Sequence, residues 1–245
     1  MRYLFFCAHP DDLEFYISNL MITVASNPKN VVKIISMTRG EYGTLEPTLR
    51  GSKLGQIRTQ ELRTAAKIEG VTDVDFLGYI DAHLEITPEA IKRVQNAIEA
   101  FNPDIVFAPE GIYSYYPHDD HIRTGLIIYY ILKNMKQKKV PKLFMYHSYM
   151  NTQYFPMIHW RRQSKALRCH KSQYHLLLPT YPLRFLLGIY FGFRLRKRLR
   201  LTFLAEAFRK VDFQVNKKRQ LGFRQRLIGR IISKVKGRFN PYKID

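Results

Sequence analysis

Short apolar runs alternate with longer mixed segments over the first 150 residues of the chain. The apolar runs predict β-strands at residues 2–8, 31–37, 74–77, 105–108 and 142–147. The segments between them predict helices at residues 13–26, 52–69, 88–101 and 121–134. Alternating strands and helices are typical of the α/β class, and right-handed crossovers make such strands parallel. We therefore predict a Rossmann-like, mostly parallel sheet flanked by helices.

Local chemistry supports several of these boundaries. Pro10 ends the first strand, because proline has no backbone N–H to donate to a sheet. Gly70 is a natural C-terminal cap for the helix before it. Thr87 and Pro88 fit the N-cap and the first position of the next helix.

Residues with metal chemistry follow two of the predicted strands. The segment Ala8-His9-Pro10-Asp11-Asp12 follows the first strand, and Pro117-His118-Asp119-Asp120-His121 follows the fourth after a short loop. Ligands of open parallel sheets gather beyond the carboxyl ends of the strands, so the two clusters can share one crevice. His9, Asp12 and His121 would then offer two imidazoles and a carboxylate to one metal ion. A cation held by so few ligands keeps a position for water, which favours a metal-assisted hydrolase.

In these two clusters the chain resembles the PIG-L/LmbE-type zinc-dependent N-acetyl-sugar deacetylases. The AHPDD segment of that family is Ala8 to Asp12, and its HxDH segment is His118 to His121. Weaker matches in family order extend the similarity over residues 2–212. They are Thr38-Arg39-Gly40-Glu41-Tyr42-Gly43, Arg58 with Glu61, Leu77-Gly78-Tyr79-Ile80-Asp81, His170-Lys171-Ser172-Gln173, and Glu206-Ala207-Phe208.

The resemblance implies a role for each residue of the two clusters. It makes His9, Asp12 and His121 the metal ligands, a set suited to Zn²⁺, with Fe²⁺ as the other candidate. Asp11 becomes the general base, which takes a proton from the metal-activated water and returns it to the departing amine. His118 stabilises the oxyanion of the tetrahedral intermediate. Asp120 fixes the tautomer of His118 and raises its basicity.

The resemblance also implies four substrate-binding residues. Glu41, Arg58 and Asp81 match sugar-binding positions, and Tyr116 matches a tyrosine that can swing onto the substrate. Arg58 has an alternative role in an ordinary helix ion pair with Glu61. Tyr116 belongs to a tyrosine-rich loop, where packing is the alternative role.

The two clusters have structural interpretations of their own. Asp11 and Asp12 can cap the helix that follows, and His118 and His121 can be neighbours on an exposed helix face. The occurrence of both clusters in one chain favours the metal site. One departure from the family is Ser18-Asn19, where many relatives have a Gly-Gly pair. We expect the Ser18-Asn19 pair to change the shape of the first helix or the approach of this helix to the substrate. The identity of the substrate therefore stays open.

Charge divides the chain into two unequal halves. Residues 1–121 carry 11 Lys and Arg against 17 Asp and Glu, whereas residues 122–245 carry 29 against 3. Such a one-sided half predicts an anionic partner. Residues 182–201 place an apolar, aromatic block against a basic block, which is typical of an interfacial membrane anchor. The alternative is a core segment followed by a solvated basic loop.

The basic residues 213–245 form a predicted tail after a deacetylase domain at residues 1–212. Apolar residues of the tail have roughly helical spacing, so it fits an amphipathic basic helix on a membrane, on RNA phosphates or on a partner subunit. An anionic membrane explains the charge without nucleic acid, which we do not expect as a partner. No apolar run reaches the roughly 18 to 20 residues that span a bilayer. Only two cysteines occur, so we expect a cytoplasmic location, peripheral at the inner face of the membrane if the anchor binds lipid.

Together these patterns predict a metal-dependent hydrolase that removes the acetyl group from an N-acetylglucosamine-type conjugate, lipid-linked or anionic. One alternative is a catalytically silent hydrolase fold that binds a membrane or nucleic acid. Another is a deacylase of a non-sugar amide. The complete set of ligands and base favours the deacetylase.

Overall fold

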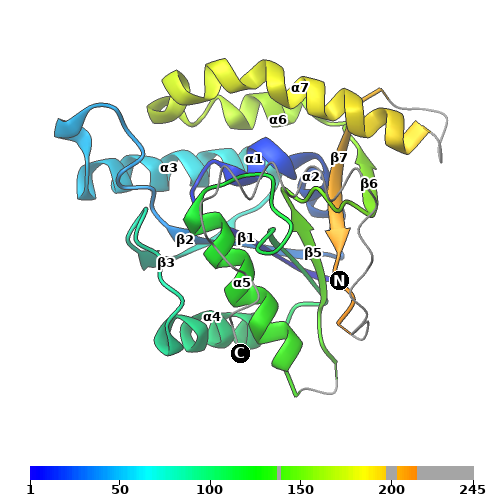
Figure 1. Cartoon of the computed structure of the whole chain (residues 1–245). Helices are drawn as coiled ribbons and strands as arrows, with labels where there is room; N and C mark the ends of the chain where they lie inside the picture. The colour runs from blue at the N-terminus through cyan, green and yellow to red at the C-terminus, as the bar shows by residue number, and fades with distance from the viewer. Residues whose placement is uncertain (137–138, 197–202, 214–245) are drawn as a thin grey trace.

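A seven-stranded sheet forms the centre of this computed structural model, with helices on both faces (Figure 1). The structure describes residues 1–136, 139–196 and 203–213. The strand order is β3-β2-β1-β4-β5-β7-β6. The strands are β1 (Arg2–Cys7), β2 (Val31–Thr38), β3 (Asp73–Tyr79), β4 (Ile105–Pro109), β5 (Lys142–Tyr146), β6 (Gln153–Pro156) and β7 (Ala205–Lys210).

Two apolar cores lie on opposite faces of the sheet. Side chains of β1 alternate between them, because successive residues of a strand point to opposite faces. Leu4 and Phe6 join one core, whereas Phe5 and Cys7 join the other. Helices α4 (Pro88–Phe101) and α5 (Asp119–Asn134) pack on the first core, and α1 (Asp12–Tyr16), α2 (Ser18–Ala25) and α3 (Ser52–Glu69) pack on the second. The described residues of α6 (Trp160–Leu167) and α7 (Tyr174–Arg196) belong to neither core. Short 3₁₀ turns occur at Pro47–Leu49 and Lys171–Gln173.

The predicted α/β fold is confirmed. Strands β1 to β5 pair in parallel, with β1 between β2 and β4 at the centre of the sheet. The predicted caps are also present. The Thr87 hydroxyl accepts a hydrogen bond from the N–H of Ala90 at 3.1 Å, and Gly70 ends α3 in the left-handed conformation. Strands β7 and β6 extend the sheet in antiparallel fashion, which the sequence analysis did not predict.

The predicted helix at residues 13–26 is wrong in one respect, because it is two helices. Helix α1 ends at Tyr16, because Ile17 has a φ of −141° that is outside the helical range, and α2 begins at Ser18. The N–H groups of Asn19 and Leu20 donate to the carboxylate of Glu206 at 2.8 and 3.0 Å. A carboxylate at a helix N-terminus satisfies amides that have no partner within the helix. This distant contact explains why the break falls at Ser18-Asn19.

Helix α7 crosses one end of the molecule in the view of Figure 1. It contains Pro179 and Pro182, and it includes most of the apolar block at residues 182–201. Among the described residues, no helix has the length and apolar character needed to cross a membrane. The predicted domain boundary at residue 212 stays a prediction, and residues 214–245 of the predicted tail lie outside the described residues.

Candidate metal centre

A pocket of about 530 Å³ lies at the carboxyl ends of the parallel strands. Segments that follow β1, β3, β4 and β5 contribute to its wall, as expected for an open α/β sheet. His9 and Asp12 reach it from the end of β1 and from α1, and His121 from the first turn of α5. The two sequence clusters therefore meet in one crevice.

The three predicted metal ligands converge. The Nδ1 of His9 lies 3.1 Å from the Nε2 of His121 and 3.9 Å from the Oδ1 of Asp12. The third side of the triangle, from His121 Nε2 to Asp12 Oδ1, is 3.3 Å. Ligands at about 2.0–2.2 Å from a tetrahedral zinc ion are separated by roughly 3.3–3.6 Å from one another. The triangle thus fits one face of a tetrahedral site.

The surroundings of the triangle also fit a cation. The Oδ2 of Asp12 accepts the N–H groups of Ala8 and His9, each at 2.9 Å, which leaves Oδ1 directed at the histidines. His118 also lies in this group, with a ligand atom within 4.8 Å of atoms from His9 and His121. Four carboxylates lie around the triangle, those of Asp11, Asp12, Asp81 and Asp120, and Arg58 is paired with Asp11. A bound cation offsets such an excess of negative charge.

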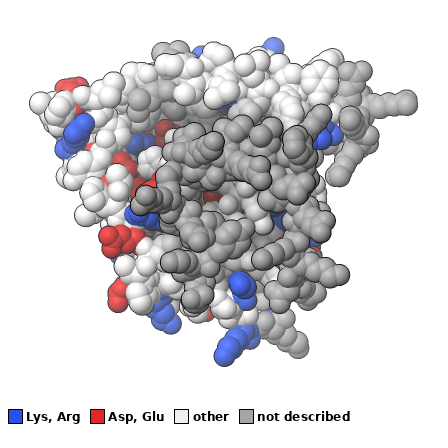
Figure 2. Space-filling model, viewed as in Figure 1, with Lys and Arg blue, Asp and Glu red and all other residues white. Residues whose placement is uncertain are grey.

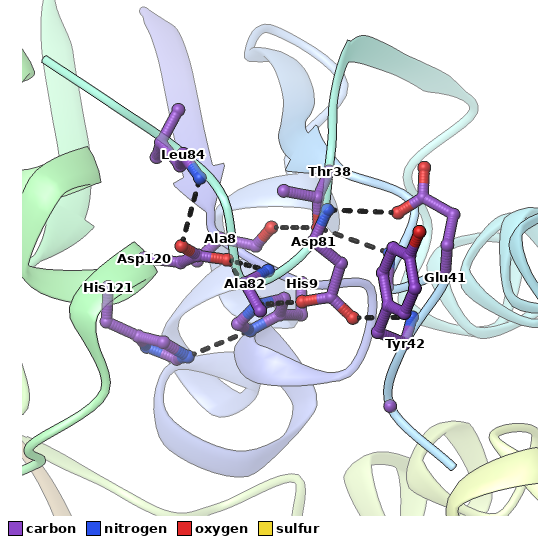
Figure 3. Close-up of polar contacts among 12 residues, drawn as sticks. Ala8, His9, Thr38, Glu41, Tyr42, Asp81, Ala82, Leu84, Asp120 and His121 are labelled. Atoms are coloured by element: carbon purple, nitrogen blue, oxygen red, sulfur yellow. Dashed lines mark hydrogen bonds and ion pairs between the residues drawn. The ribbon is translucent and has the colours of Figure 1, made fainter. Parts of the chain in front are cut away.

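The other ring nitrogen of His9 is held by two carboxylates (Figure 3). Its Nε2 lies 2.9 Å from Asp81 Oδ1 and 3.2 Å from Asp120 Oδ2. Burial would lower the pKa of His9, but hydrogen bonds with Asp120 and Asp81 raise it to about 10. These partners therefore favour a proton on Nε2 and fix the orientation of the ring, which leaves Nδ1 toward the other two residues. A carboxylate behind a ligating histidine typically sets its tautomer and strengthens it as a ligand.

The predicted partner of Asp120, His118, is not the one it contacts in this structure. The Asp120 carboxylate accepts the N–H groups of Ala82 and Leu84, at 2.7 and 3.3 Å, and contacts His9. The Nδ1 of His118 has no hydrogen-bond partner among the described residues. The contacts of Asp120 are therefore those of a residue that supports His9, and its role behind His118 stays a prediction.

Asp81, which was predicted to bind the sugar, is in contact with other residues of the site. It lines the pocket, but its Oδ1 faces His9 and its Oδ2 accepts the N–H of Tyr42 at 3.0 Å. The predicted sugar-binding residue Glu41 is not among the residues that line the pocket. The Oε2 of Glu41 accepts the N–H of Asp81 at 3.4 Å, so Glu41 supports this loop from behind.

The predicted base, Asp11, forms an ion pair with Arg58. The Nη2 of Arg58 lies 2.7 Å from Asp11 Oδ1, and its Nη1 donates to the carbonyl of Gly40 at 3.0 Å. Burial would raise the pKa of Asp11, but the charges of Arg58 and nearby histidines bring it below its usual value. Gly40 has a φ of +68°, and a Cβ there would overlap the guanidinium of Arg58. This close approach accounts for the glycine in the Thr38-Arg39-Gly40 segment.

His118 and Tyr116 also line the pocket, and both rings lie next to that of His121. Their rings stack at a centroid distance of 6.2 Å, and Tyr116 meets His121 edge to face at 4.8 Å. Burial lowers the pKa of His118, so its imidazole is neutral near pH 7. Burial raises the pKa of Tyr116 to about 12, which keeps its hydroxyl protonated and able to donate. Both residues are therefore positioned as neutral hydrogen-bonding groups toward a substrate.

His147 lies beside this group, although the sequence analysis did not single it out. His147 follows β5 at the carboxyl edge of the sheet, is buried, and its ring centroid lies 5.1 Å from that of His121. Neither ring nitrogen has a hydrogen-bond partner among the described residues. Its place at the carboxyl end of a predicted strand was the signal that could have identified it. Tyr16, whose ring centroid lies 3.7 Å from that of His147, gave no such signal, because it lies near the start of a predicted helix.

The part of the pocket formed by α7 differs from the part around the histidines. It is lined by Leu183, Leu187 and Phe191, with Met157 from the segment after β6. Arg184 is the charged residue of this wall, and it is only 6% exposed. The pocket thus has a polar half with the candidate metal ligands and a mainly apolar half, in which the guanidinium of Arg184 lies near the carboxyl of Glu206.

The sequence profile of the PIG-L family, described as GlcNAc-PI de-N-acetylase, matches residues 4–132, which is more than half of the chain. A probable N-acetyl-alpha-D-glucosaminyl L-malate deacetylase 2 from Bacillus anthracis is 32% identical over 146 residues, covering 56% of this chain and 61% of the relative. A diacetylchitobiose deacetylase from Thermococcus kodakarensis is 29% identical over 119 residues, 49% of this chain and 44% of the relative. The chain therefore matches about half the length of these curated relatives.

A solved structure extends the similarity to most of the fold. The N,N'-diacetylchitobiose deacetylase from Pyrococcus horikoshii aligns with a TM-score of 0.78 and 23% identity, over 86% of this chain and 84% of that one. At this identity the alignment establishes the shared fold.

Proposed function

Because the chain belongs to the PIG-L family, we propose that it is a metal-dependent hydrolase that removes the acetyl group from an N-acetylglucosamine-type conjugate. The observation that carries the proposal is the triangle of His9, Asp12 and His121, with sides of 3.1 to 3.9 Å, beside the Asp11–Arg58 pair. Relatives named for deacetylation of N-acetylglucosaminyl malate and diacetylchitobiose support the acetamide substrate.

The proposed cation is Zn²⁺, with Fe²⁺ as the alternative, held by His9, Asp12 and His121. When bound, such a cation supplies Lewis acidity and lowers the pKa of a water molecule toward about 7. Asp11 receives the proton of the attacking water on its carboxylate, which Arg58 keeps ionised and oriented. The same carboxyl then returns the proton to the departing amine. His118 donates to the oxygen that becomes negative in the tetrahedral intermediate.

The polar half of the pocket is proposed to hold the sugar. Arg58, Asp81 and Tyr116 line it, although Arg58 and Asp81 also orient Asp11 and His9. The apolar half is proposed to hold the aglycone, so an aglycone with an apolar part suits this pocket. We also propose a cytoplasmic location at the inner face of a membrane, which the exposed apolar side chains of α7 support.

The test is acetate release from a panel of N-acetylglucosamine conjugates by the metal-loaded protein. We expect Asp11→Asn to retain one metal ion per chain and to lose at least about a hundredfold in turnover, because general-base catalysis contributes roughly 10²–10⁴-fold. We expect His121→Ala to lose the metal as well, which metal analysis after dialysis would detect.

The matched control is Asp119→Asn, since Asp119 lies in the first turn of α5 with His121 but is exposed and paired with Arg123. Turnover by Asp11→Asn at the wild-type rate would make the base assignment wrong. Full metal occupancy without acetate release from any conjugate would favour a non-sugar amide first, and a catalytically silent binding protein second.

A further inference from the structure

The outward face of α7 is apolar from residue 182 to residue 193. Leu183, Leu186, Ile189, Tyr190 and Phe193 are all exposed, and Leu186 and Phe193 keep 62% and 59% of their surface in solvent. These residues recur every three or four positions, so they form one stripe along the helix. In Figure 2, the edge of the molecule where Figure 1 places α7 is mostly white, with few charged atoms.

The inward face of α7 has the opposite character. Arg184 is the only Lys, Arg, Asp or Glu between residues 176 and 193, and it is turned inward and buried. Gly188 and Gly192 allow the helix to lie close to the chain before β7, because a Cβ at Gly188 would lie 3.2 Å from Leu204 and from Met157. A helix on a water-exposed surface normally turns its charged face outward. The reversed orientation of α7 therefore indicates that its outward face is covered by another apolar phase.

We propose that this outward stripe docks on the surface of an anionic lipid bilayer, with Arg194 at its end as the described basic residue. Five of the seven residues at positions 194–200 are Lys or Arg. Phe203, which is 80% exposed, is a further large apolar side chain near this end of α7, and its carbonyl lies close to Gly192. Apolar side chains among acyl chains and basic side chains at phosphates are the two contacts that hold an interfacial helix.

Charge complementarity favours lipid over a second copy of the chain. No acidic residue occurs between Ile122 and Ala205, a segment that includes all of α6 and α7. In a symmetric dimer the same basic, acid-free surface would be present on both sides of the contact. An anionic bilayer supplies the opposite charge and the apolar phase together.

The docking surface shares a wall with the pocket. Leu183 is 56% exposed and also lines the pocket, where Leu187 and Phe191 continue the same apolar lining. This part of the inference rests on the proposed function. An N-acetylated sugar linked to a lipid could then present its head group to the metal centre while its chain stays near the bilayer.

The experiment is sedimentation of the full chain with vesicles of phosphatidylcholine alone or of equal parts phosphatidylcholine and phosphatidylglycerol. We expect binding to the anionic vesicles to exceed binding to the neutral ones. The double variant Leu186→Gln, Phe193→Gln should lower the partition coefficient by roughly tenfold or more, because two large apolar groups leave the acyl phase. Raising the salt should weaken wild-type binding without abolishing it, since only the charge contribution is screened.

The control variant is Tyr130→Gln, which removes a 39% exposed ring from α5, a helix outside the stripe. Acetate release from a water-soluble N-acetylglucosamine conjugate is measured for every variant as a control for catalysis. Neither Leu186 nor Phe193 lines the pocket, so their replacement should not affect this reaction. Release should be unchanged, so loss of vesicle binding and failure of the proposed function are separate results. Equal vesicle binding by wild type and the double variant would overturn the proposal. A second result would also overturn it: the wild type does not bind vesicles but forms a concentration-dependent dimer, and the double variant is monomeric. The stripe would then be a contact between two copies of the chain.

Discussion

At the scale of single residues, the sequence predicted which groups meet but not always which atoms they face. The order of His118, Asp120 and His121 on one helix turn is visible in the sequence, and so is their joint position at a strand end. The partner of Asp120 depends on the loop after β3, which brings the N–H groups of Ala82 and Leu84 to its carboxylate. Ala82 adopts a positive φ of 63°, a conformation that the sequence does not predict for alanine. The contacts of Asp120 are therefore those of a residue that supports His9.

Asp120→Asn tests this assignment. An amide in place of the carboxylate weakens the hold on the Nε2 of His9, so we expect metal affinity to fall about 10- to 100-fold. Competition with a chelator of known affinity measures the change. Asp119→Asn is the matched control, and its metal affinity should equal that of wild type because the Asp119 side chain is 66% exposed. Wild-type metal affinity in Asp120→Asn, with only turnover reduced, would return Asp120 to the predicted role behind His118.

At the scale of elements, the packing of α5 against the end of β4 positions half of the metal centre. A Cβ at Gly125 would overlap the carbonyl oxygen of Pro109 and would lie 2.6 Å from the backbone nitrogen of Gly111. Helix α5 therefore touches the backbone after β4 one turn beyond His121. Only glycine permits this approach, which sets the depth at which the first turn of the helix enters the crevice.

Gly125→Ala should therefore affect both stability and metal binding. The added methyl group meets rigid backbone, so we expect the free energy of unfolding of the metal-free protein to fall by about 1–3 kcal/mol. Urea titration measures this, and metal titration of the folded variant should show weaker binding as His121 shifts. Tyr130→Ala on the exposed side of the same helix should change the free energy of unfolding by no more than about 0.5 kcal/mol. Equal effects from the two substitutions would contradict the close-packing argument.

The elements that could be predicted from sequence are those with local signals. The strands from β1 to β5 are short apolar runs, and α3 and α4 have glycine or threonine and proline at their ends. The break between α1 and α2 could not be predicted, because it depends on Glu206, which is 187 residues from Asn19 in the chain. The inward orientation of Arg184 could not be predicted either, because both faces of α7 are rich in apolar residues.

At the scale of the whole molecule, buried polar contacts join the acidic N-terminal half to the basic C-terminal half. The Asn19 side chain bonds to Gln163 of α6 and to Glu206 of β7, and its Oδ1 accepts the N–H of His159 at 2.7 Å. Glu69, which accepts a hydrogen bond from the Ser18 hydroxyl, adds a further buried carboxyl. Burial and the nearby charge of Glu14 raise the pKa of Glu69 well above its usual value. The contact between the halves is therefore sensitive to protonation.

Glu206 makes that sensitivity measurable. Burial raises its pKa from 4.5 to about 7, although hydrogen bonds from Asn19 and Leu20 act in the opposite direction. Between these two values the folded chain holds a proton on Glu206 that the unfolded chain has lost. The free energy of unfolding contributed by this group therefore falls as pH rises, by at most about 1.4 kcal/mol per pH unit.

We expect urea denaturation of the metal-loaded protein between about pH 5 and pH 7 to show this decline, and Glu206→Gln to flatten it. The slope is the relevant quantity, because the amide also changes one hydrogen bond and so shifts stability at every pH. Glu99→Gln, at an exposed position of α4, should keep the wild-type slope. If Glu206→Gln and wild type had parallel slopes, Glu206 would be ionised throughout this range. The Glu206 carboxylate would then make a permanent ionic contact with Arg184, whose charge lies near it. Protonation at this wall of the pocket would in that case not change the stability of the protein in this pH range.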